Sequence, residues 1–174
     1  PEYPSIVYSR ILKSIYPDVP IILGGIEASL RRLVHYDYWQ NKLLPGMSIL
    51  SPADLIISGM GELPLAEVGE RRKAGADIAE LRKILQTTYA VDAQDFQPQE
   101  GDLRLFSYEE CLKDKKKQAM NFKHIEEESN KFHASRIIQP CGDRVISVKP
   151  PFPPLTTGQI AAACAVPSPR LPDP

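Results

Sequence analysis

The stretch that decides the fold runs from residue 20 to residue 62 and holds two similar segments, PIILGGIE at 20–27 and DLIISGMGE at 54–62. Each is a short apolar run, rich in β-branched residues, that ends in glycines followed by a carboxylate. Runs that are apolar on both faces are typical of central strands covered by helices on both sides. We therefore predict two neighbouring parallel strands in an α/β fold.

The glycines fall where these two strands end. Gly24 and Gly25 follow the first strand, and Gly59 and Gly61 follow the second. Glycine lets the backbone turn sharply and brings its amides close to a ligand, and open α/β sheets bind ligands at the carboxyl ends of their strands. These glycines are candidate cofactor-binding residues, the alternative being that they serve only tight turns. Neither loop is a complete dinucleotide fingerprint or a phosphate loop with its lysine.

Two carboxylates, Glu27 and Glu62, stand just after the glycines, each near the start of a predicted helix. The helix dipole favours a carboxylate there even without a ligand, which is the structural interpretation. If the two strands are adjacent, both acids border one crevice and are candidate binding residues that accept hydrogen bonds from hydroxyl groups. Arg31 and Arg32 are placed to neutralise these acids or an incoming anion.

Helices are predicted where apolar residues recur at helical spacing, over residues 4–16, 27–33, 62–73 and 77–85. In the first of them, Val7, Ile11 and Ile15 form a stripe that we expect to pack onto the sheet. A third strand is predicted at 87–91. Helices that alternate with strands predict a parallel sheet, so we expect a partial parallel sheet of Rossmann-like, cobalamin-binding-like type with flanking helices.

A polar stretch without periodicity from Asp92 to Gly101 predicts a loop and a domain boundary. It divides the chain into a Rossmann-like half-domain at 1–95 and a second part at 96–174. In the second part, Ser107 and Glu110 have the spacing of a capping box, which predicts a long helix running toward residue 130. Two short runs rich in β-branched residues flank the turn-like PCGD at 140–143, and together they predict a β-hairpin.

The chain ends in a proline-rich tail. The whole chain contains 17 prolines, nearly twice the usual share of about 5%, and many of them lie near its end. Four of them within residues 150–154 predict an extended path, after which Thr156 or Thr157 caps a short helix. We expect this tail to wrap around or link to another part of the protein.

Composition limits the possible functions. With 21 basic and 22 acidic residues, no bulk field attracts nucleic acid or anionic lipid. No apolar run reaches about 18 residues, so no membrane span is predicted. The cysteines Cys111, Cys141 and Cys164 lie far apart and predict neither a disulfide framework nor a metal site, which fits a cytoplasmic protein. Because the chain starts at Pro1, we expect it to be cut from something longer.

A dense block of aromatic and titratable side chains, HYDYW, occupies residues 35–39. A histidine near an acid suggests proton transfer, but residues two apart rarely meet side chain to side chain on a helix. We therefore interpret the block as packing or an interdomain surface, and we assign no catalytic residue.

Several motifs give the chain a family resemblance. It is similar to the YgiQ-type radical SAM proteins, bacterial iron–sulfur proteins of unassigned reaction, at GGIEASLRR (24–32), HYDYW (35–39), GMGE (59–62), SYEE (107–110), GDR (142–144) and PPFPPL (150–155). In such proteins a Rossmann-like amino-terminal region precedes a barrel-like core. A C-x-x-x-C-x-x-C motif of that core holds a [4Fe-4S] cluster that binds S-adenosylmethionine.

This sequence has no such cysteine triplet, so the resemblance implies a region that is not catalytic alone and that binds no metal. The glycine loops also resemble the Gly-Gly and Gly-x-Gly-Glu turns of cobalamin-binding domains, at Gly24, Gly25, Gly59, Gly61 and Glu62. The Asp-x-His-x-x-Gly signature of a cobalamin-ligating histidine is absent. Cobalamin therefore stays an alternative.

The resemblance implies an accessory region whose partner is the radical SAM core of the same polypeptide. We expect it to cover that core and to shape a substrate or cofactor crevice at the strand ends. The alternative is a scaffold or interaction module that binds no small molecule. If strands are missing before Pro1, an exposed sheet edge predicts a homodimer.

Overall fold

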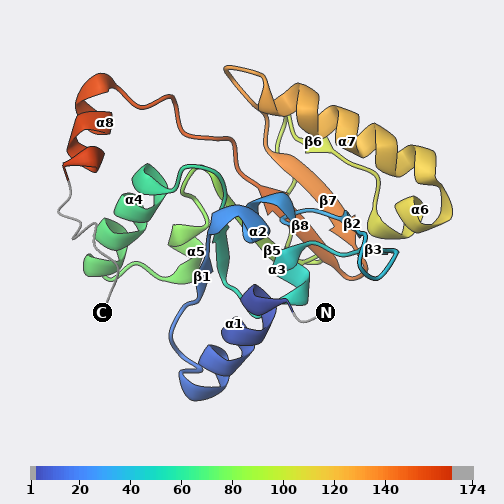
Figure 1. The fold of residues 1–174 in the computed structure, drawn as a ribbon, viewed down its shortest axis with the longest axis horizontal. Helices are drawn as coiled ribbons and strands as arrows, with labels where there is room; N and C mark the ends of the chain where they lie inside the picture. The colour runs from blue at the N-terminus through green and yellow to red at the C-terminus, as the bar shows by residue number, and fades with distance from the viewer. Residues whose placement is uncertain (1–2, 166–174) are drawn as a thin grey trace.

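The computed structural model describes residues 3–165, and it is built on one mixed sheet of six strands (Figure 1). In spatial order these are β1 (Ile22–Leu23), β4 (Leu55–Ile57), β5 (Thr87–Asp92), β8 (Arg144–Val148), β7 (Ile137–Cys141) and β6 (Leu103–Arg104). A separate hairpin pairs β2 (His35–Asp37) with β3 (Lys42–Leu44). The helices are α1 (Pro4–Ile15), α2 (Gly25–Leu30), α3 (Met47–Leu50), α4 (Glu62–Lys73), α5 (Ile78–Leu81), α6 (Tyr108–Lys113), α7 (Lys115–Ser129) and α8 (Thr157–Cys164).

The α/β class and the parallel pair are confirmed. β1 and β4 are parallel neighbours, with Ile22 opposite Leu55. The third predicted strand, β5, is present but runs antiparallel to β4, so the parallel part of the sheet is only partial. The predicted hairpin is confirmed as β7 and β8, which turn at Gly142 with a φ of 63°.

The sheet continues across the domain boundary predicted at residue 95. β8 pairs with β5 along five residue positions, from Thr88 opposite Val148 to Asp92 opposite Arg144. The division into 1–95 and 96–174 therefore does not separate two sheets. As a division into folding units it stays a prediction.

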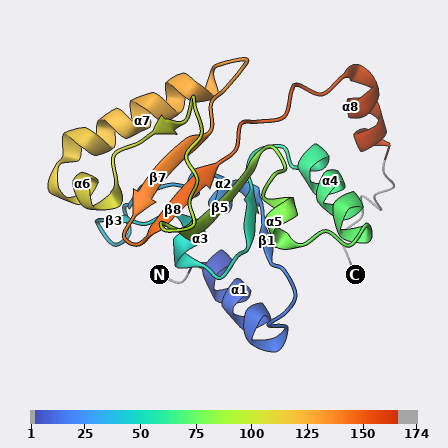
Figure 2. The ribbon, with the colours of Figure 1, turned by 180° about the vertical axis from the view of Figure 1, so that it is seen from behind.

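The core lies on both faces of β4, as its apolar sequence predicts. Ile56 packs with Ala28 and Met47 on the side of α2 and α3, and Leu55 and Ile57 pack on the other side against α4 and α5. A third cluster of buried apolar side chains includes Ile137 of β7 and Ile146 of β8 and packs them against Leu33 and Leu105. Figures 1 and 2 show α6 and α7 beside β7 at one end of the molecule and α4, α5 and α8 at the other.

Helix α1 differs from the prediction. It buries Ile6 and Ser9, whereas Ile11 and Ile15 of the predicted stripe are 49% and 58% exposed. The prediction that this stripe packs onto the sheet is wrong. The apolar contact of α1 with the body is at its amino-terminal half, where Ile6 joins the cluster of Ala28 and Met47. Its carboxyl-terminal half is held by polar contacts instead, among them an ion pair between Lys13 and Asp54 at 3.2 Å (Figure 1).

The predicted long helix is two helices. The capping box of Ser107 and Glu110 is confirmed at the start of α6. At Asp114 the backbone leaves the helical region, with φ −142° and ψ 107°, and the Asp114 carboxylate accepts the Lys116 N–H at 2.9 Å. Asp114 therefore ends α6 and caps α7, which is why one continuous helix was a wrong prediction.

The proline-rich tail leads into α8, which Thr156 caps through a capping box with Gln159, as predicted for Thr156 or Thr157. No residue of α8 is buried. Within residues 3–165, no helix has the length and apolar character needed to cross a membrane.

Candidate functional site

The two glycine bends lie side by side at one rim of the sheet. β1 and β4 are parallel neighbours, and a Cβ atom built on Gly24 would lie 3.8 Å from the Ile57 carbonyl oxygen. Gly25 and Gly59 have φ angles of 84° and 72°, which glycine adopts far more readily than other residues. The shared rim predicted from the sequence is confirmed.

The two bends are tied together by Ser29 of α2. Its hydroxyl donates to the Gly25 carbonyl at 2.7 Å and accepts the Gly59 N–H at 3.1 Å. The Gly59 amide, one of the groups expected to face a ligand, is thereby bound to a protein acceptor.

The two predicted carboxylates have different surroundings. Glu27 lies in the first turn of α2, accepts a hydrogen bond from the Ser5 hydroxyl of α1 and forms an ion pair with Arg31 at 3.3 Å. Glu62 begins α4 and lines a cavity. The structure thus binds Glu27 to α1 rather than bringing it to the cavity wall where Glu62 lies.

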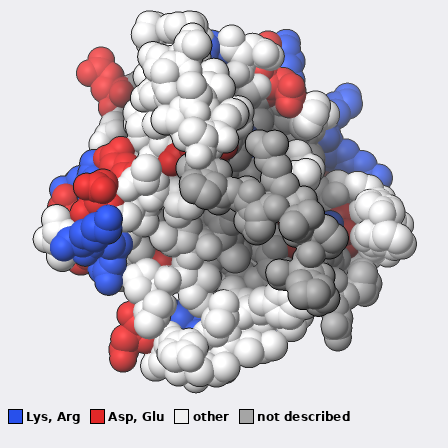
Figure 3. Space-filling view, turned by 60° about the vertical axis from the view of Figure 1, so that its left-hand side comes forward, with Lys and Arg blue, Asp and Glu red and all other residues white. Residues whose placement is uncertain are grey.

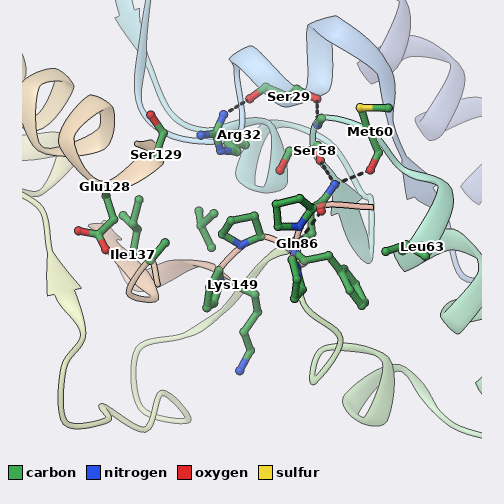
Figure 4. Close-up of a pocket in the computed structure, with 18 of the residues that line it drawn as sticks. Ser29, Arg32, Ser58, Met60, Leu63, Gln86, Glu128, Ser129, Ile137 and Lys149 are labelled. Atoms are coloured by element: carbon green, nitrogen blue, oxygen red, sulfur yellow. Dashed lines mark hydrogen bonds between the residues drawn. The ribbon is translucent and has the colours of Figure 1, made fainter. Parts of the chain in front are cut away.

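This cavity, of about 670 Å³, opens beside the rim (Figure 4). Its walls come from α2, the loop between β4 and α4, α7, and the segment 150–155, which we call the proline segment. Of the candidate residues from the sequence, Gly59 and Glu62 are among the described residues that line it, and Gly24, Gly25, Glu27 and Gly61 are not. The wall is mainly apolar, with Ile125, Ile137, Val148, Phe152 and Leu155 among its members.

Gln86 joins the glycine loop to the proline segment. Its side-chain amide donates to the carbonyls of Ser58 and Met60 at 2.8 and 2.6 Å, and its side-chain oxygen accepts the Phe152 N–H at 3.2 Å. Its backbone N–H donates to the Pro150 carbonyl at 2.7 Å. Gln86 has a φ of 62°, which is uncommon for a residue other than glycine. The sequence gives no sign of this role.

Arg32 faces the cavity from just beyond α2. Its Nη1 donates to the Ser29 carbonyl, and its Nε is buried without a hydrogen-bond partner. Among the described residues, no carboxylate lies within ion-pair distance of this guanidinium. Burial lowers the pKa of Arg32, and the nearby Glu126 partly opposes that change.

Glu128 of α7 is the buried carboxylate of the cavity wall. It accepts hydrogen bonds from the Lys131 amine at 2.6 Å and from the Ser135 N–H. Burial raises the pKa of Glu128, but these two hydrogen bonds outweigh burial and lower it below its usual value. Glu128 is therefore an ionised group whose charge Lys131 already neutralises.

The aromatic block at 35–39 forms β2 and the turn that follows it. Asp37 is buried and accepts hydrogen bonds from the Tyr3 hydroxyl and the Gln40 N–H, while His35 Nδ1 contacts the Leu33 carbonyl at 3.1 Å. His35 and Asp37 thus have separate hydrogen-bond partners. The exposed rings of Tyr38 and Trp39 lie 4.6 Å apart, and their role as an interdomain surface stays a prediction.

Comparison with known proteins gives the family. A model of the Radical SAM N-terminal family matches residues 1–174. This chain belongs to that family. The chain is similar to proteins named UPF0313: it is 57% identical over 175 residues to one from Porphyromonas gingivalis and 52% identical over 185 residues to one from Bacteroides thetaiotaomicron. A third, from Geobacter sulfurreducens, is 36% identical over 174 residues.

Each of these three comparisons covers the whole chain. It covers only 28%, 30% and 29% of the length of the respective relative. The chain therefore spans less than a third of the length of the curated relatives it matches. No solved structure matches it.

The described residues of this chain do not fit an iron–sulfur cluster. Cys111 and Cys141 are buried, Cys164 is exposed on α8, and residues 3–165 contain no group of three metal-ligating side chains. Burial raises the pKa of the Cys141 thiol to about 11, so it stays protonated, whereas a cluster needs thiolates. For cobalamin, neither His124 nor His133 belongs to the glycine loops or lines the cavity.

Proposed function

We propose that this chain is the amino-terminal accessory region of a longer radical SAM iron–sulfur protein. It covers the radical SAM core of the same polypeptide and supplies one wall of a substrate or cofactor crevice. The core, not this chain, binds the [4Fe-4S] cluster and S-adenosylmethionine. The family match and the greater length of the relatives support this proposal.

The observation that carries the proposal is α8. It has eight residues, none of them buried, and its apolar Ile160 is 48% exposed. Helices this short are marginal in water unless another surface packs on them. Figure 3 views the side of the molecule that carries α8 and α4, where most of the described surface is uncharged. We propose that the core packs against this side.

Hydrogen exchange measured by mass spectrometry tests the proposal. The amides of α8 are compared in the purified 174-residue chain and in the full-length protein, with the amides of α6, at the opposite end of the molecule, as the internal control. Contact with the core slows exchange in α8 at least tenfold in the full-length protein and leaves α6 unchanged. Equal exchange rates of α8 in both samples would refute the proposal.

A second candidate function is a scaffold module that binds no small molecule. The hydrogen bond from the Gly59 amide to Ser29 favours it, because a loop whose amide is already bound offers less to a ligand. Melting temperatures and absorbance spectra with cobalamin, S-adenosylmethionine and nucleotides separate the two candidates. A shift with any of these compounds, in the chain or in the full-length protein, argues against the scaffold.

The compartment and the oligomeric state belong to the same proposal. We place the protein in the cytoplasm, because free cysteines such as Cys111 and Cys141 suit a reducing compartment. A homodimer through a sheet edge would use β1 or β6, each of two residues, which offer few backbone groups. Light scattering of the purified chain decides between monomer and dimer.

A further inference from the structure

Several described arginines form no ion pair, and Arg32 is the one of them that lines the cavity. Arg31, Arg71 and Arg136 each form an ion pair, with N–O separations of 3.3 Å or less. Arg32 forms none with the described residues, although it lines the cavity and its Nε is shielded from water. Arg32 is half-buried, and a guanidinium that is partly removed from water without an ion pair is unfavourable unless something else compensates it.

The structural interpretation of Arg32 is that it stabilises the end of α2. Its Nη1 donates to the Ser29 carbonyl in the last turn, where a positive charge is favoured by the helix dipole. This contact uses one of the five N–H donors of the guanidinium. The remaining donors have no hydrogen-bond acceptor among the described residues, and the carboxylate of Glu126 acts on the positive charge only from beyond ion-pair distance.

The other charges around the cavity favour a ligand with a single negative charge. The Lys149 amine points away from the cavity in Figure 4. Glu62 lines the wall, and its carboxylate repels a second negative charge, whereas the charge of Glu128 is neutralised by Lys131. The volume of about 670 Å³ lies within the usual range of small-molecule sites, roughly 300 to 1,000 Å³, and the mainly apolar wall suits an apolar ligand body.

We propose that the cavity binds a monoanionic carboxylate with an apolar body, whose carboxylate pairs with Arg32. The apolar body lies against Ile137, Val148 and Phe152, and Gln86 keeps the proline segment in place behind it. This inference names the ligand class for the crevice of the proposed function and rests on it. A carboxylate suits a guanidinium because two parallel N–H donors match its two oxygens.

Isothermal titration calorimetry of the purified chain at pH 7.5 tests the inference with three probes of equal chain length. These are octanoate, its neutral analogue octanamide, and octyl phosphate, which carries more than one negative charge. Octanoate binds at least tenfold more tightly than octanamide, because only the carboxylate forms a charge-assisted bond with Arg32. Octyl phosphate binds more weakly than octanoate.

Two variants assign the effect to one guanidinium. Arg32→Met weakens octanoate binding tenfold to a hundredfold and leaves octanamide binding within twofold. The matched control is Arg82→Met, because Arg82 also has a buried Nε without a partner but does not line the cavity. Arg82→Met keeps octanoate affinity within twofold of the wild type.

Several outcomes would overturn the inference. They are equal affinity for octanoate and octanamide, no octanoate binding, a preference for octyl phosphate, or unchanged octanoate affinity in Arg32→Met. If Arg32→Met does not fold, the octanoate-to-octanamide ratio of the wild type decides alone. Since the hydrogen-exchange test of core packing does not depend on any ligand, failure of this inference and failure of the proposed function are separate results.

Discussion

Two irregular segments connect strands or follow them, and different chemistry holds each in place. The polar loop, residues 93–102, is held by an ion pair to Arg136, the residue before β7. The proline segment, residues 150–155, closes the cavity and is held by neutral amide hydrogen bonds. Both were predicted from the sequence as irregular, but the sequence did not show what anchors either one.

The polar loop depends on Arg136. Its Nε and Nη2 donate to the two carboxylate oxygens of Asp102 at 2.8 and 2.6 Å, and its Nη2 also donates to the Gln97 carbonyl at 3.0 Å. The guanidinium lies 5.3 Å from the centre of the Phe96 ring. The side chains of Arg136 and Asp102 are only 9% and 11% exposed, so solvent screens this pair weakly.

The proline segment depends on Gln86 and uses no charged group in its bonds to Pro150 and Phe152. The two anchors, one charged and one neutral, should respond differently to a change of pH. A charged anchor is sensitive to acid, whereas an amide anchor is not. A neutral anchor also brings no carboxylate that would compete for Arg32 in the cavity.

The largest expected effect is at the ion pair. Arg136→Met leaves Asp102 nearly buried without its counter-charge, and we expect it to lower the free energy of unfolding by about 3–5 kcal/mol. Urea denaturation followed by circular dichroism measures this loss. Lys83→Met, which breaks the exposed pair with Glu80, is the matched control, with an expected loss below about 1 kcal/mol. Equal losses in the two variants would show that the Arg136 pair is no stronger than a surface pair.

The next effect is at the neutral anchor. Gln86→Ala removes three side-chain hydrogen bonds, and at about 0.5–1.5 kcal/mol each we expect a loss of about 1.5–4.5 kcal/mol. Gln86→Gly removes the same bonds but relieves the positive φ, so it is expected to be about 1 kcal/mol more stable than Gln86→Ala. The same urea denaturation measures both variants. If the glycine variant is the less stable one, the backbone at residue 86 is not strained.

Acid separates the two anchors. The hydrogen bonds from Arg136 lower the pKa of Asp102, although burial partly opposes them. Because the folded pKa is depressed, this stabilisation is fully present above the unfolded pKa of about 3.9 and is lost as pH falls through the folded pKa. In urea denaturation between pH 7 and pH 3, the loss caused by Arg136→Met therefore shrinks, and the loss caused by Gln86→Ala stays constant. A parallel decline in both variants would mean that the amide anchor also depends on a titrating group.

The smallest expected effect comes from the prolines, which restrict the backbone in both segments. Pro98 in the polar loop and Pro151 in the proline segment are both exposed. Replacing either by alanine adds conformational freedom to the unfolded chain, and we expect each variant to lose about 0.4–1 kcal/mol. Thermal unfolding by calorimetry measures both. A loss at Pro151 well above that at Pro98 would reveal a packing role for Pro151 beyond stiffness.

Local signals predicted much of the fold. The helix at 62–73 has its predicted bounds, and the capping box at Ser107 is present. The helix predicted over 77–85 is present but shorter, as α5 over Ile78–Leu81 with Asp77 as its cap. Each of these features depends on residues a few positions apart, so sequence spacing is enough to find it. The parallel pair of β1 and β4 was found in the same way, from two short apolar runs.

Contacts between distant residues were not predictable. The direction of β5 depends on pairing with β8, and the clamp at Gln86 joins residues 58–60 to residues 150–152. The hairpin of β2 and β3 was missed because its turn lacks an Asn-Gly signal, although Asn41 adopts a φ of 52° there. Arg32 was noted as a possible anion partner, but only the fold shows that Arg31, and not Arg32, is taken by Glu27.

The position of β8 between β5 and β7 has a consequence for how the protein is synthesised. Residues 88 and 92 of β5 pair with residues 148 and 144, so the partners lie 52 to 60 positions apart. While the ribosome adds residues 93–143, one side of β5 has unsatisfied backbone groups, and nascent chains in this state are prone to aggregate. Ribosome pausing or premature termination before Val148 therefore leaves an open strand that chaperones must shield.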